Sequence, residues 1–274
     1  MEQQIVKIGK ISIGNKLPFL LIAGPDSLES MSHAMYMAKS IKKICDELKI
    51  PYIFKASYDK ANRTSIKSFR GVGLDKGMAI LKKIKEEVGV PVTTDVHTDQ
   101  EAKIAAKTVD LIQIPALLSR QTDLITTAAK TKKPINIKKG QFMSPQSINS
   151  VIGKVMSVGN KNILVTERGY IFGYNNLVVD MRSLEIMKKF GQPVVFDASH
   201  SIQLPSAGKG VSDGQREFIF TLAKAAIAVG ISAVFIEVHN NPNKAPVDGP
   251  NSLELKNLKK VLKKLKAIDE IVKI

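Results

Sequence analysis

The sequence predicts a (β/α)8 barrel, an α/β TIM-barrel fold, with an N-terminal β-hairpin over residues 1–17. Three observations predict it: eight short apolar runs rich in β-branched residues, amphipathic helical patterns between them, and no linker-like change of composition along the chain. Eight βα units of roughly 30 residues each fill a chain of 274 residues. We therefore expect one catalytic domain over residues 1–274.

The expected strands are near-continuous apolar runs, which are typical of a parallel sheet covered on both faces. They are residues 19–24, 52–57, 91–96, 111–115, 134–138, 163–168, 193–199 and 233–238. Ahead of them, "IVKIGKISIGN" predicts a two-stranded hairpin that closes the bottom of the barrel. A doubly wound sheet is the competing architecture, but "AGPDSLES" after the first run lacks the G-x-G-x-x-G loop such a sheet usually carries.

The expected helices have apolar residues on one face and lysines on the other. Examples are "MSHAMYMAKSIKKICDEL", "DKGMAILKKIKEEV" and the last helix, "SLELKNLKKVLKKLKAI". Thr98 and Glu101 have the spacing of a capping box at the start of another helix. Cys45 falls on the apolar face of the first helix, so we expect it to be a packing residue and not a nucleophile.

Composition limits the classes of function. The net charge is +16, which suits nucleic acid, anionic membrane or anionic small molecules, although lysines that only coat helix faces explain much of it. Aromatic residues make up 5% of the chain, which argues against stacking on single-stranded nucleic acid. We expect no nucleic-acid or membrane partner. No transmembrane run or signal peptide is recognisable, and a single cysteine suits a cytoplasmic location.

Ionisable and amide residues stand at nearly every expected strand end, where the active site of a barrel lies. The set is Lys55, Asp95, His97, Gln113, Lys138, Arg168, His200, Glu237 and His239. Each alone has an ordinary structural explanation as a satisfied surface or core residue. So many charges at one rim are costly unless they serve a ligand.

The cations of this rim predict an anionic substrate, because arginine and lysine bind phosphate and carboxylate. They are Lys55, Lys60, Arg63, Lys138 and Arg168, and the loop after the second strand adds Asn62 and Thr64. Two separate cationic clusters would indicate two phosphorylated substrates. Residues 204–217, rich in Gly, Ser and Pro, predict a mobile lid over the mouth, with a plain surface loop as the alternative.

A second set of polar residues suits a divalent metal. Asp26, His200, Glu237 and Asp248 come from the first, seventh and eighth strand ends, which are neighbours in a closed barrel. Their N and O ligands suit Mn²⁺, Fe²⁺, Zn²⁺ or Mg²⁺. A hydrogen-bonded network with no metal is the alternative, and no organic cofactor is expected.

Several motifs together resemble the 3-deoxy-D-manno-octulosonate 8-phosphate synthases over residues 5–265. They are "FKASYDKANRTSIKSFRG", "TDVH", "QIPALLSRQTDL", "NIKKGQFMSP", "TERGYIFGYNNLVVDMR", "DASHSIQLP" and "IEVHNNPNKAPVDGPNSL". The resemblance implies a homotetramer that condenses phosphoenolpyruvate, arabinose 5-phosphate and water on the route to lipopolysaccharide, releasing phosphate. Two alternatives stay open. One is the related heptulosonate 7-phosphate synthase reaction with erythrose 4-phosphate, against which "KANRTS" argues. The other is a basic barrel that binds RNA or an anionic surface without catalysis.

The resemblance also implies roles for individual residues. Phosphoenolpyruvate would be held by Lys55, Lys138, Arg168, Gln113 and the backbone at Ala116, and the sugar phosphate by Asn62, Arg63 and Thr64. Lys60 and Asp95 would lie near the reacting aldehyde, and His200 or a carboxylate such as Asp26 or Asp248 would manage the proton of water. The family divides into metal-dependent members with Cys and metal-independent members with Asn at the position of Asp26. "DASHSIQLP" favours the first type and "APVDGPNSL" some members of the second.

Overall fold

The fold is a closed parallel barrel in the computed structural model, which describes residues 2–63, 65–205 and 213–273. Its strands, in chain order, are β3 (Leu20–Gly24), β4 (Tyr52–Lys55), β5 (Val92–Asp95), β6 (Leu111–Ile114), β7 (Ile135–Lys138), β8 (Ile163–Glu167), β11 (Val194–Asp197) and β14 (Ala233–His239). Each pairs in parallel with the next, β14 also pairs with β3, and β11 pairs with β14 to complete the ring. The barrel expected from the sequence is confirmed, and the doubly wound alternative is wrong because the sheet has no open edge between these strands.

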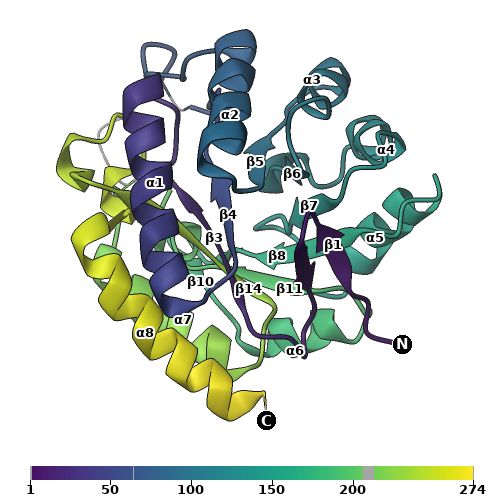
Figure 1. Cartoon of the computed structure of the whole chain (residues 1–274). Helices are drawn as coiled ribbons and strands as arrows, with labels where there is room; N and C mark the ends of the chain where they lie inside the picture. The colour runs from purple at the N-terminus through teal and green to yellow at the C-terminus, as the bar shows by residue number, and fades with distance from the viewer. Residues whose placement is uncertain (1, 64, 206–212, 274) are drawn as a thin grey trace.

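Eight helices surround the strands (Figure 1) in the part of the chain that the structure describes. They are α1 (Met31–Leu48), α2 (Leu74–Val88), α3 (Asp99–Ala105), α4 (Thr122–Lys130), α5 (Ile148–Met156), α6 (Arg182–Lys188), α7 (Ile219–Ala228) and α8 (Leu255–Val272). The first and last, α1 and α8, lie side by side. Cys45 is buried in the face that α1 turns to the barrel, as expected.

The start of α3 confirms one half of the expected capping box. The Thr98 hydroxyl accepts the Glu101 N–H at 3.2 Å, and so caps the helix. The Glu101 carboxylate does not return to Thr98; it accepts the backbone N–H of His97 at 2.7 Å and lies 3.1 Å from the His97 ring. The acid therefore fixes the residue before the cap, at the end of β5.

The barrel interior is apolar at the bottom and polar at the top. Because side chains alternate along a strand, residues two apart point to the same side. Five strands carry an apolar residue at the lower interior level and a polar one two positions on: Ile53 and Lys55, Leu111 and Gln113, Leu164 and Thr166, Val195 and Asp197, Phe235 and Glu237. All ten are nearly or fully buried.

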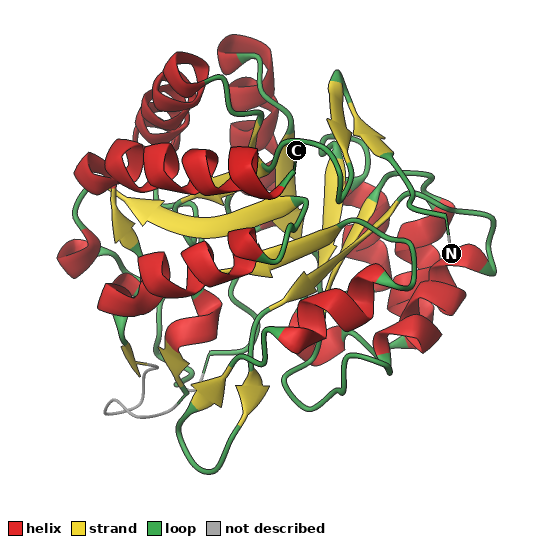
Figure 2. Cartoon of the chain, turned by 90° about the horizontal axis from the view of Figure 1, so that it is seen from below, coloured by secondary structure: helices red, strands yellow, loops and turns green. Residues whose placement is uncertain are grey.

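The N-terminal hairpin closes the apolar end, as expected. It consists of β1 (Val6–Ile8) and β2 (Ile11–Ile13), paired antiparallel. Val6, Ile8 and Ile13 are buried in the same cluster as the lower interior residues of the barrel. Figure 2 shows this hairpin at one end of the molecule and short strand pairs at the other.

Short strands border the polar end. β9 (Tyr170–Ile171) pairs with β10 (Leu177–Val178), β12 (Gln203–Leu204) pairs with β13 (Asp213–Gly214), and β15 (Leu253–Glu254) extends β14. The described parts of the expected lid at 204–217 therefore include a two-stranded ribbon and the beginning of a 3-10 helix, η3 (Arg216–Phe218). Residues 206–212 lie outside the described residues, and lid motion stays a prediction.

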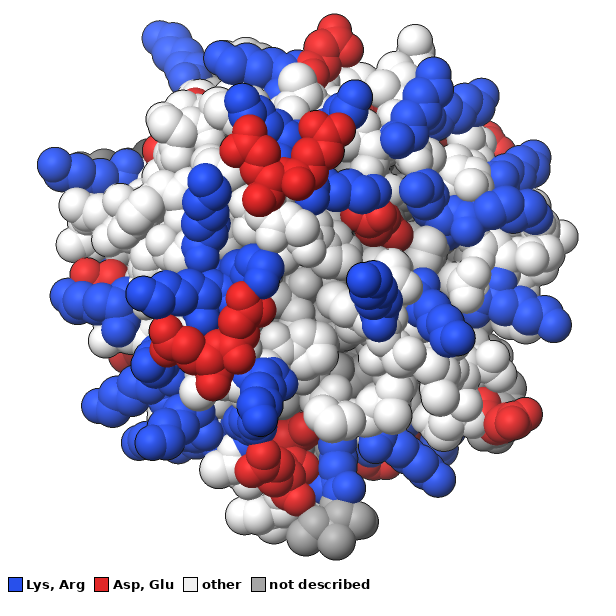
Figure 3. All heavy atoms as spheres, viewed as in Figure 1, with Lys and Arg blue, Asp and Glu red and all other residues white. Residues whose placement is uncertain are grey.

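The surface charge is dispersed. On the face shown in Figure 3, lysines and arginines are spread over the whole view with acidic residues among them. Lysine pairs with glutamate four residues on along α2, for example Lys83 with Glu87 at 3.4 Å. Most of the positive charge on this face is therefore a solvated coat on helices. Within the described residues, no helix is long and apolar enough to cross a membrane.

Candidate active site

A cavity of about 640 Å³ opens at the polar end of the barrel. It is lined by twelve of the residues that the sequence nominates: Lys55, Lys60, Asn62, Arg63, Asp95, His97, Gln113, Ala116, Lys138, Arg168, His200 and Asp248. Asp26 and Glu237 lie next to it, within 4 Å of Lys55 and His200. Thr64 lies outside the described residues. Residues from distant parts of the chain are thus gathered at one mouth, although their individual roles stay predictions.

The loop after β3 brings Asp26 to the centre of this site. A Cβ at Gly24 would lie 2.0 Å from the Lys55 carbonyl oxygen, so only glycine lets the chain pass this close to β4. Lys60 donates a hydrogen bond to Oδ1 of Asp26. Asp26 Oδ2 is buried and has no hydrogen-bond partner among the residues that the structure describes. A buried carboxylate oxygen left in this state is a natural ligand for a cation.

His200 faces a group of carboxylates. Its Nε2 lies 3.8 Å from Asp26 Oδ1 and 3.9 Å from both Glu237 Oε1 and Asp248 Oδ2. Asp26, His200 and Asp248 have ligand atoms that all lie within 4.8 Å of one another. Asp248 has φ +48°, a left-handed conformation that is uncommon outside glycine and clusters at functional sites. This trio fits a divalent ion, with Glu237 close to it.

Asp197 fixes the orientation of His200, and sequence reasoning missed it. His200 Nδ1 lies 2.7 Å from Asp197 Oδ2, and Oδ1 of the same carboxylate accepts the backbone N–H groups of Ser199 and His200. Nδ1 therefore carries the proton, and the Nε2 lone pair points at the carboxylates. The D-x-x-H spacing in "DASH" could have indicated this contact, because an acid three residues before a histidine can hydrogen-bond the histidine ring.

Burial and neighbouring charges separate the pKa values of these acids. Burial opposes ionisation of Asp26, but Lys60, Lys55 and His200 outweigh it and lower its pKa to about 2. Burial raises the pKa of Glu237 to about 8, and that of Asp248 to about 6 with help from Asp26. Burial lowers the pKa of His200 to about 4, against the attraction of Asp197. At neutral pH the site holds a neutral imidazole and a protonated Glu237.

All three of the nominated lysines already have acidic partners, since Lys60 donates to Asp26. Lys55 Nζ lies 3.2 Å from Glu237, 3.7 Å from Asp95 and 4.0 Å from Asp26. Lys138 donates to Asp197 and lies 3.8 Å from the centre of the Phe235 ring. The rim is therefore not simply cationic, as the sequence suggested, because carboxylates neutralise much of its charge.

The two nominated arginines are different, because each has a nitrogen with no partner. Among the described residues, the buried Nε of Arg63 and Nη1 of Arg168 find no hydrogen-bond partner, although Nη1 of Arg63 lies 3.9 Å from Asp248 Oδ1. Arg168 is 4% exposed, donates to Gln203 through Nη2 at 2.9 Å, and has no carboxylate within ion-pair distance among the described residues. Buried guanidinium donors left open in a cavity are suited to an anionic ligand.

A line of polar side chains crosses four adjacent strands beneath the cavity. Asp95 accepts from Gln113 at 2.5 Å, Gln113 accepts from Asn136 at 3.0 Å, and Asn136 accepts from Thr166 at 2.6 Å. Ser57 also donates to Asp95 at 2.5 Å. Asn136, Thr166 and Ser57 were not nominated from the sequence, since single small polar residues in an apolar run carry no signal of their own. The line holds Asp95 and Gln113 in fixed orientations.

His239 was expected at the rim, but it does not line the cavity. It pairs with Glu29 at 2.8 Å, and its ring lies 4.7 Å from that of His33. Its Nδ1 accepts the Asn241 N–H at 2.9 Å, so Nε2 carries the proton that Glu29 accepts and has no lone pair for a metal. We interpret Glu29, His33 and His239 as a hydrogen-bonded support for the loop that carries Asp26.

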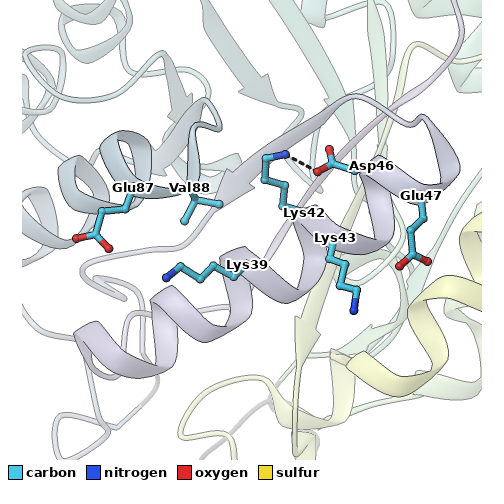
Figure 4. A pocket seen from close by; sticks show the side chains of 7 residues that line it. All are labelled: Lys39, Lys42, Lys43, Asp46, Glu47, Glu87 and Val88. Carbon is cyan, nitrogen blue, oxygen red and sulfur yellow. Dashed lines mark hydrogen bonds and ion pairs between the residues drawn. The ribbon is translucent and has the colours of Figure 1, made fainter.

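A second hollow lies on the outside of the barrel, between α1 and α2 (Figure 4). It is lined by Lys39, Lys42, Lys43, Asp46, Glu47, Glu87 and Val88. Lys42 pairs with Asp46 there, and the other charged side chains extend along the helix surfaces. Except for Lys42, its charged side chains are exposed to solvent, unlike the buried polar groups of the cavity at the mouth.

Comparison with known proteins gives one consistent family. The model of the "DAHP synthetase I family" matches residues 2–274. The chain is 54% identical over 268 residues to a 2-dehydro-3-deoxyphosphooctonate aldolase of Geotalea uraniireducens, covering 98% of both chains. Proteins of the same name from Geobacter sulfurreducens and Rickettsia bellii are 52% and 50% identical, covering 98% and 99% of both chains.

Proposed function

The chain belongs to the DAHP synthetase I family, and from that premise we propose that it forms 2-dehydro-3-deoxyphosphooctonate, the compound for which its relatives are named. The substrates are phosphoenolpyruvate, arabinose 5-phosphate and water, and inorganic phosphate is released. The observation that carries the proposal is the pair of unpartnered arginine nitrogens, on Arg63 and Arg168, in one cavity. Two anionic substrates need two such positions. The relatives' names favour this reaction over the heptulosonate alternative.

The proposed chemistry assigns phosphoenolpyruvate to the side of the cavity formed by Arg168, Lys138, Gln113 and the backbone at Ala116, with Lys55 beneath. Arg63 and Asn62 take the sugar phosphate. Carbon 3 of phosphoenolpyruvate attacks the aldehyde, carbon 2 becomes electron-poor, water adds to it, and its bond to the phosphate oxygen breaks. The residues orient two substrates and neutralise their charges. Orientation and charge stabilisation each raise the reaction rate by large factors.

The centre of the site suits the two proton-handling steps. Lys60, which donates to Asp26, is placed to hydrogen-bond the aldehyde oxygen as charge develops on it, with Asp95 nearby. His200 presents a neutral Nε2, so it can accept a proton from the attacking water when no metal occupies that nitrogen, and a carboxylate such as Asp248 takes this role when one does. Asp26 and Asp248 surround that nitrogen and favour the cationic imidazolium that results.

We also propose that Asp26, His200 and Asp248, with Glu237 adjacent, hold a divalent metal. The support is the unpartnered Asp26 Oδ2 and Glu237 Oε2, and a His200 lone pair directed at carboxylates. When bound, such an ion supplies Lewis acidity. Equilibrium dialysis with Mn²⁺ tests this: Asp26→Asn should bind more weakly than the wild type and Asp26→Cys more tightly. Equal binding by all three, or full activity after exhaustive EDTA treatment unchanged by Mn²⁺, would contradict it.

The proposed setting is a cytoplasmic homotetramer that supplies lipopolysaccharide precursors. Large apolar side chains near the mouth support an assembly: Leu117, Phe142, Ile171, Phe172 and Tyr174 are between 48% and 97% exposed. Exposed apolar groups gathered in one region are typical of interfaces. Light scattering on the purified protein should give four times the mass of the 30.0 kDa chain; a monomer would contradict the assembly without affecting the reaction.

The reaction is tested by mixing the protein with phosphoenolpyruvate and one sugar phosphate at a time. Phosphate should appear with arabinose 5-phosphate and much more slowly with erythrose 4-phosphate. With ¹⁸O in the bridging position of phosphoenolpyruvate, the label should leave in the phosphate. Arg63→Ala should weaken use of the sugar phosphate, whereas the exposed Arg182, paired with Asp180, gives the matched control Arg182→Ala. No phosphate release, or equal rates with both sugars, would overturn the proposal.

A further inference from the structure

Two neighbouring strands end in the same arrangement, with one charged residue facing into the barrel and its sequence neighbour facing out. Lys138 and Arg168 line the cavity, and because side chains alternate, Lys139 and Glu167 point to the outer side of the sheet. There Lys139 Nζ lies 3.5 Å from Glu167 Oε1, and both side chains are fully buried. An ion pair on the outside therefore joins the two strand ends that carry cations inside.

Every oxygen of Glu167 is in use. Oε1 accepts the backbone N–H of Arg168 at 2.9 Å and of Gly169 at 2.7 Å, and Oε2 accepts the Ser183 hydroxyl of α6 at 2.8 Å. Gly169 has φ +93°, a conformation that favours glycine, so the chain turns sharply right after Arg168. The carboxylate thus fixes the peptide groups on both sides of the Arg168 Cα.

Lys139 makes the corresponding contacts on the other strand. Its Nζ donates to the carbonyl oxygens of Gly140 and Met143 at 3.1 and 3.2 Å, and it lies 3.6 Å from the centre of the Tyr170 ring. Tyr170 belongs to β9, which directly follows the turn at Gly169. The ammonium group therefore joins the segment after Lys138 to the segment after Arg168.

Stability alone does not account for a buried ion pair in this place. Moving two charges out of water is expensive, and well-packed apolar residues often replace such a pair with no loss of stability. What apolar residues cannot do is accept two backbone N–H groups and donate to two carbonyl groups. The distinctive contribution of Lys139 and Glu167 is therefore the geometry of the backbone.

We propose that Lys139 and Glu167 are positioning residues that set the separation and direction of Lys138 and Arg168, and so the fit of the cavity to the phosphate of phosphoenolpyruvate. The proposal rests on the proposed function. It predicts that damage to the pair impairs one substrate only, because the sugar-phosphate side, around Arg63, is built on a different loop.

The test is Glu167→Gln, which keeps the size and the acceptor oxygen but removes the charge that attracts Lys139. The KM for phosphoenolpyruvate should rise about ten-fold or more, whereas the KM for arabinose 5-phosphate should stay within about two-fold. The matched control is Asp269→Asn. Asp269 is also buried, pairs with Lys273 at 2.7 Å and accepts the Phe19 N–H at 2.9 Å, but at the opposite end of the barrel.

Both variants should lose stability, but only Glu167→Gln should shift the KM for phosphoenolpyruvate. Equal shifts in the two variants, or a lower kcat with both KM values unchanged, would overturn the positioning role. If the wild type releases no phosphate from phosphoenolpyruvate, the proposed function fails. Calorimetric titration with inorganic phosphate then tests the pair separately: Glu167→Gln should bind phosphate at least about ten-fold more weakly than Asp269→Asn, and equal affinities would overturn it.

Discussion

The lower and upper halves of the barrel interior are built on the same strands, yet they follow opposite rules. At the lower level Ile53, Leu111 and Leu164 join the residues of the hairpin in one apolar cluster. Two positions on, the same strands hold Lys55, Gln113 and Thr166, which are equally buried but polar. Burial alone therefore does not distinguish a structural residue from a functional one in this protein.

The difference lies in whether the buried groups are satisfied. Burial of the lower residues stabilises the folded state by about 25 cal/mol per Å² of apolar surface removed from water. Within the described parts of the chain, the upper half keeps unpartnered polar atoms on Asp26, Arg63, Arg168 and Glu237, each of which costs free energy. Strand β8 shows both rules at once, since Leu164 lies in the lower interior and Arg168 directly follows the strand at the mouth. We infer that the lower half stabilises the fold and the upper half is held ready for ligands.

The largest expected effect is on catalysis. Arg168→Met should lower kcat/KM for phosphoenolpyruvate by about 10²–10³-fold, the usual result of removing one charge-stabilising donor. Burial already lowers the pKa of Arg168, and it has no carboxylate partner within ion-pair distance among the described residues. Its removal should therefore leave the free energy of unfolding unchanged or raise it. Wild-type kcat/KM for this variant in the phosphate-release assay would show that Arg168 in the upper half does not serve the substrate.

Leu164→Ala should show the reverse. A fully buried leucine in a packed interior leaves a cavity when truncated, at a cost of about 2–5 kcal/mol in the free energy of unfolding. Urea unfolding measures this cost. Turnover per folded molecule should stay within about two-fold of the wild type, because Leu164 does not line the active-site cavity; a hundred-fold loss would show that the two halves are not separable.

The pH dependence of stability tests the protonation of Glu237 in the upper half. Its pKa of about 8 in the folded protein lies above its ordinary value of 4.5, so the folded state holds a proton that the unfolded state releases. This contribution to stability is fully present below pH 4.5 and is lost as the pH rises through 8. In EDTA, the melting temperature of the wild type should therefore fall relative to Glu237→Gln between pH 5 and 9. A constant difference would show that Glu237 is ionised throughout.

The smallest effect is expected at the hairpin. Ile8→Val removes one methyl group from the bottom of the barrel and should cost about 0.5–1.5 kcal/mol in the free energy of unfolding. Chemical unfolding against the wild type resolves a change of this size. No change in either KM is expected, and a shifted KM would mean that the hairpin influences the mouth.

The sequence predicted most of the fold, because eight apolar runs with helical patterns between them leave few arrangements. It also located the mouth, since a polar residue at each strand end converges there in any barrel. It could not predict which charges pair: Lys55 among three carboxylates depends on the closure of β3 onto β14. Asp197, Glu167 and Lys139 were missed because each acts through a neighbour, and only the folded backbone shows which neighbour.

The most direct test of the account uses two residues of one segment, Arg168→Met and Leu164→Ala, measured side by side for phosphate release per folded molecule and for unfolding in urea. We expect opposite results for the two variants. Arg168→Met should lose activity at wild-type stability or better, and Leu164→Ala should lose stability at near wild-type activity. If both variants lose activity and stability together, the upper and lower interiors act as one unit, and their division into a ligand-binding half and a stabilising half is wrong.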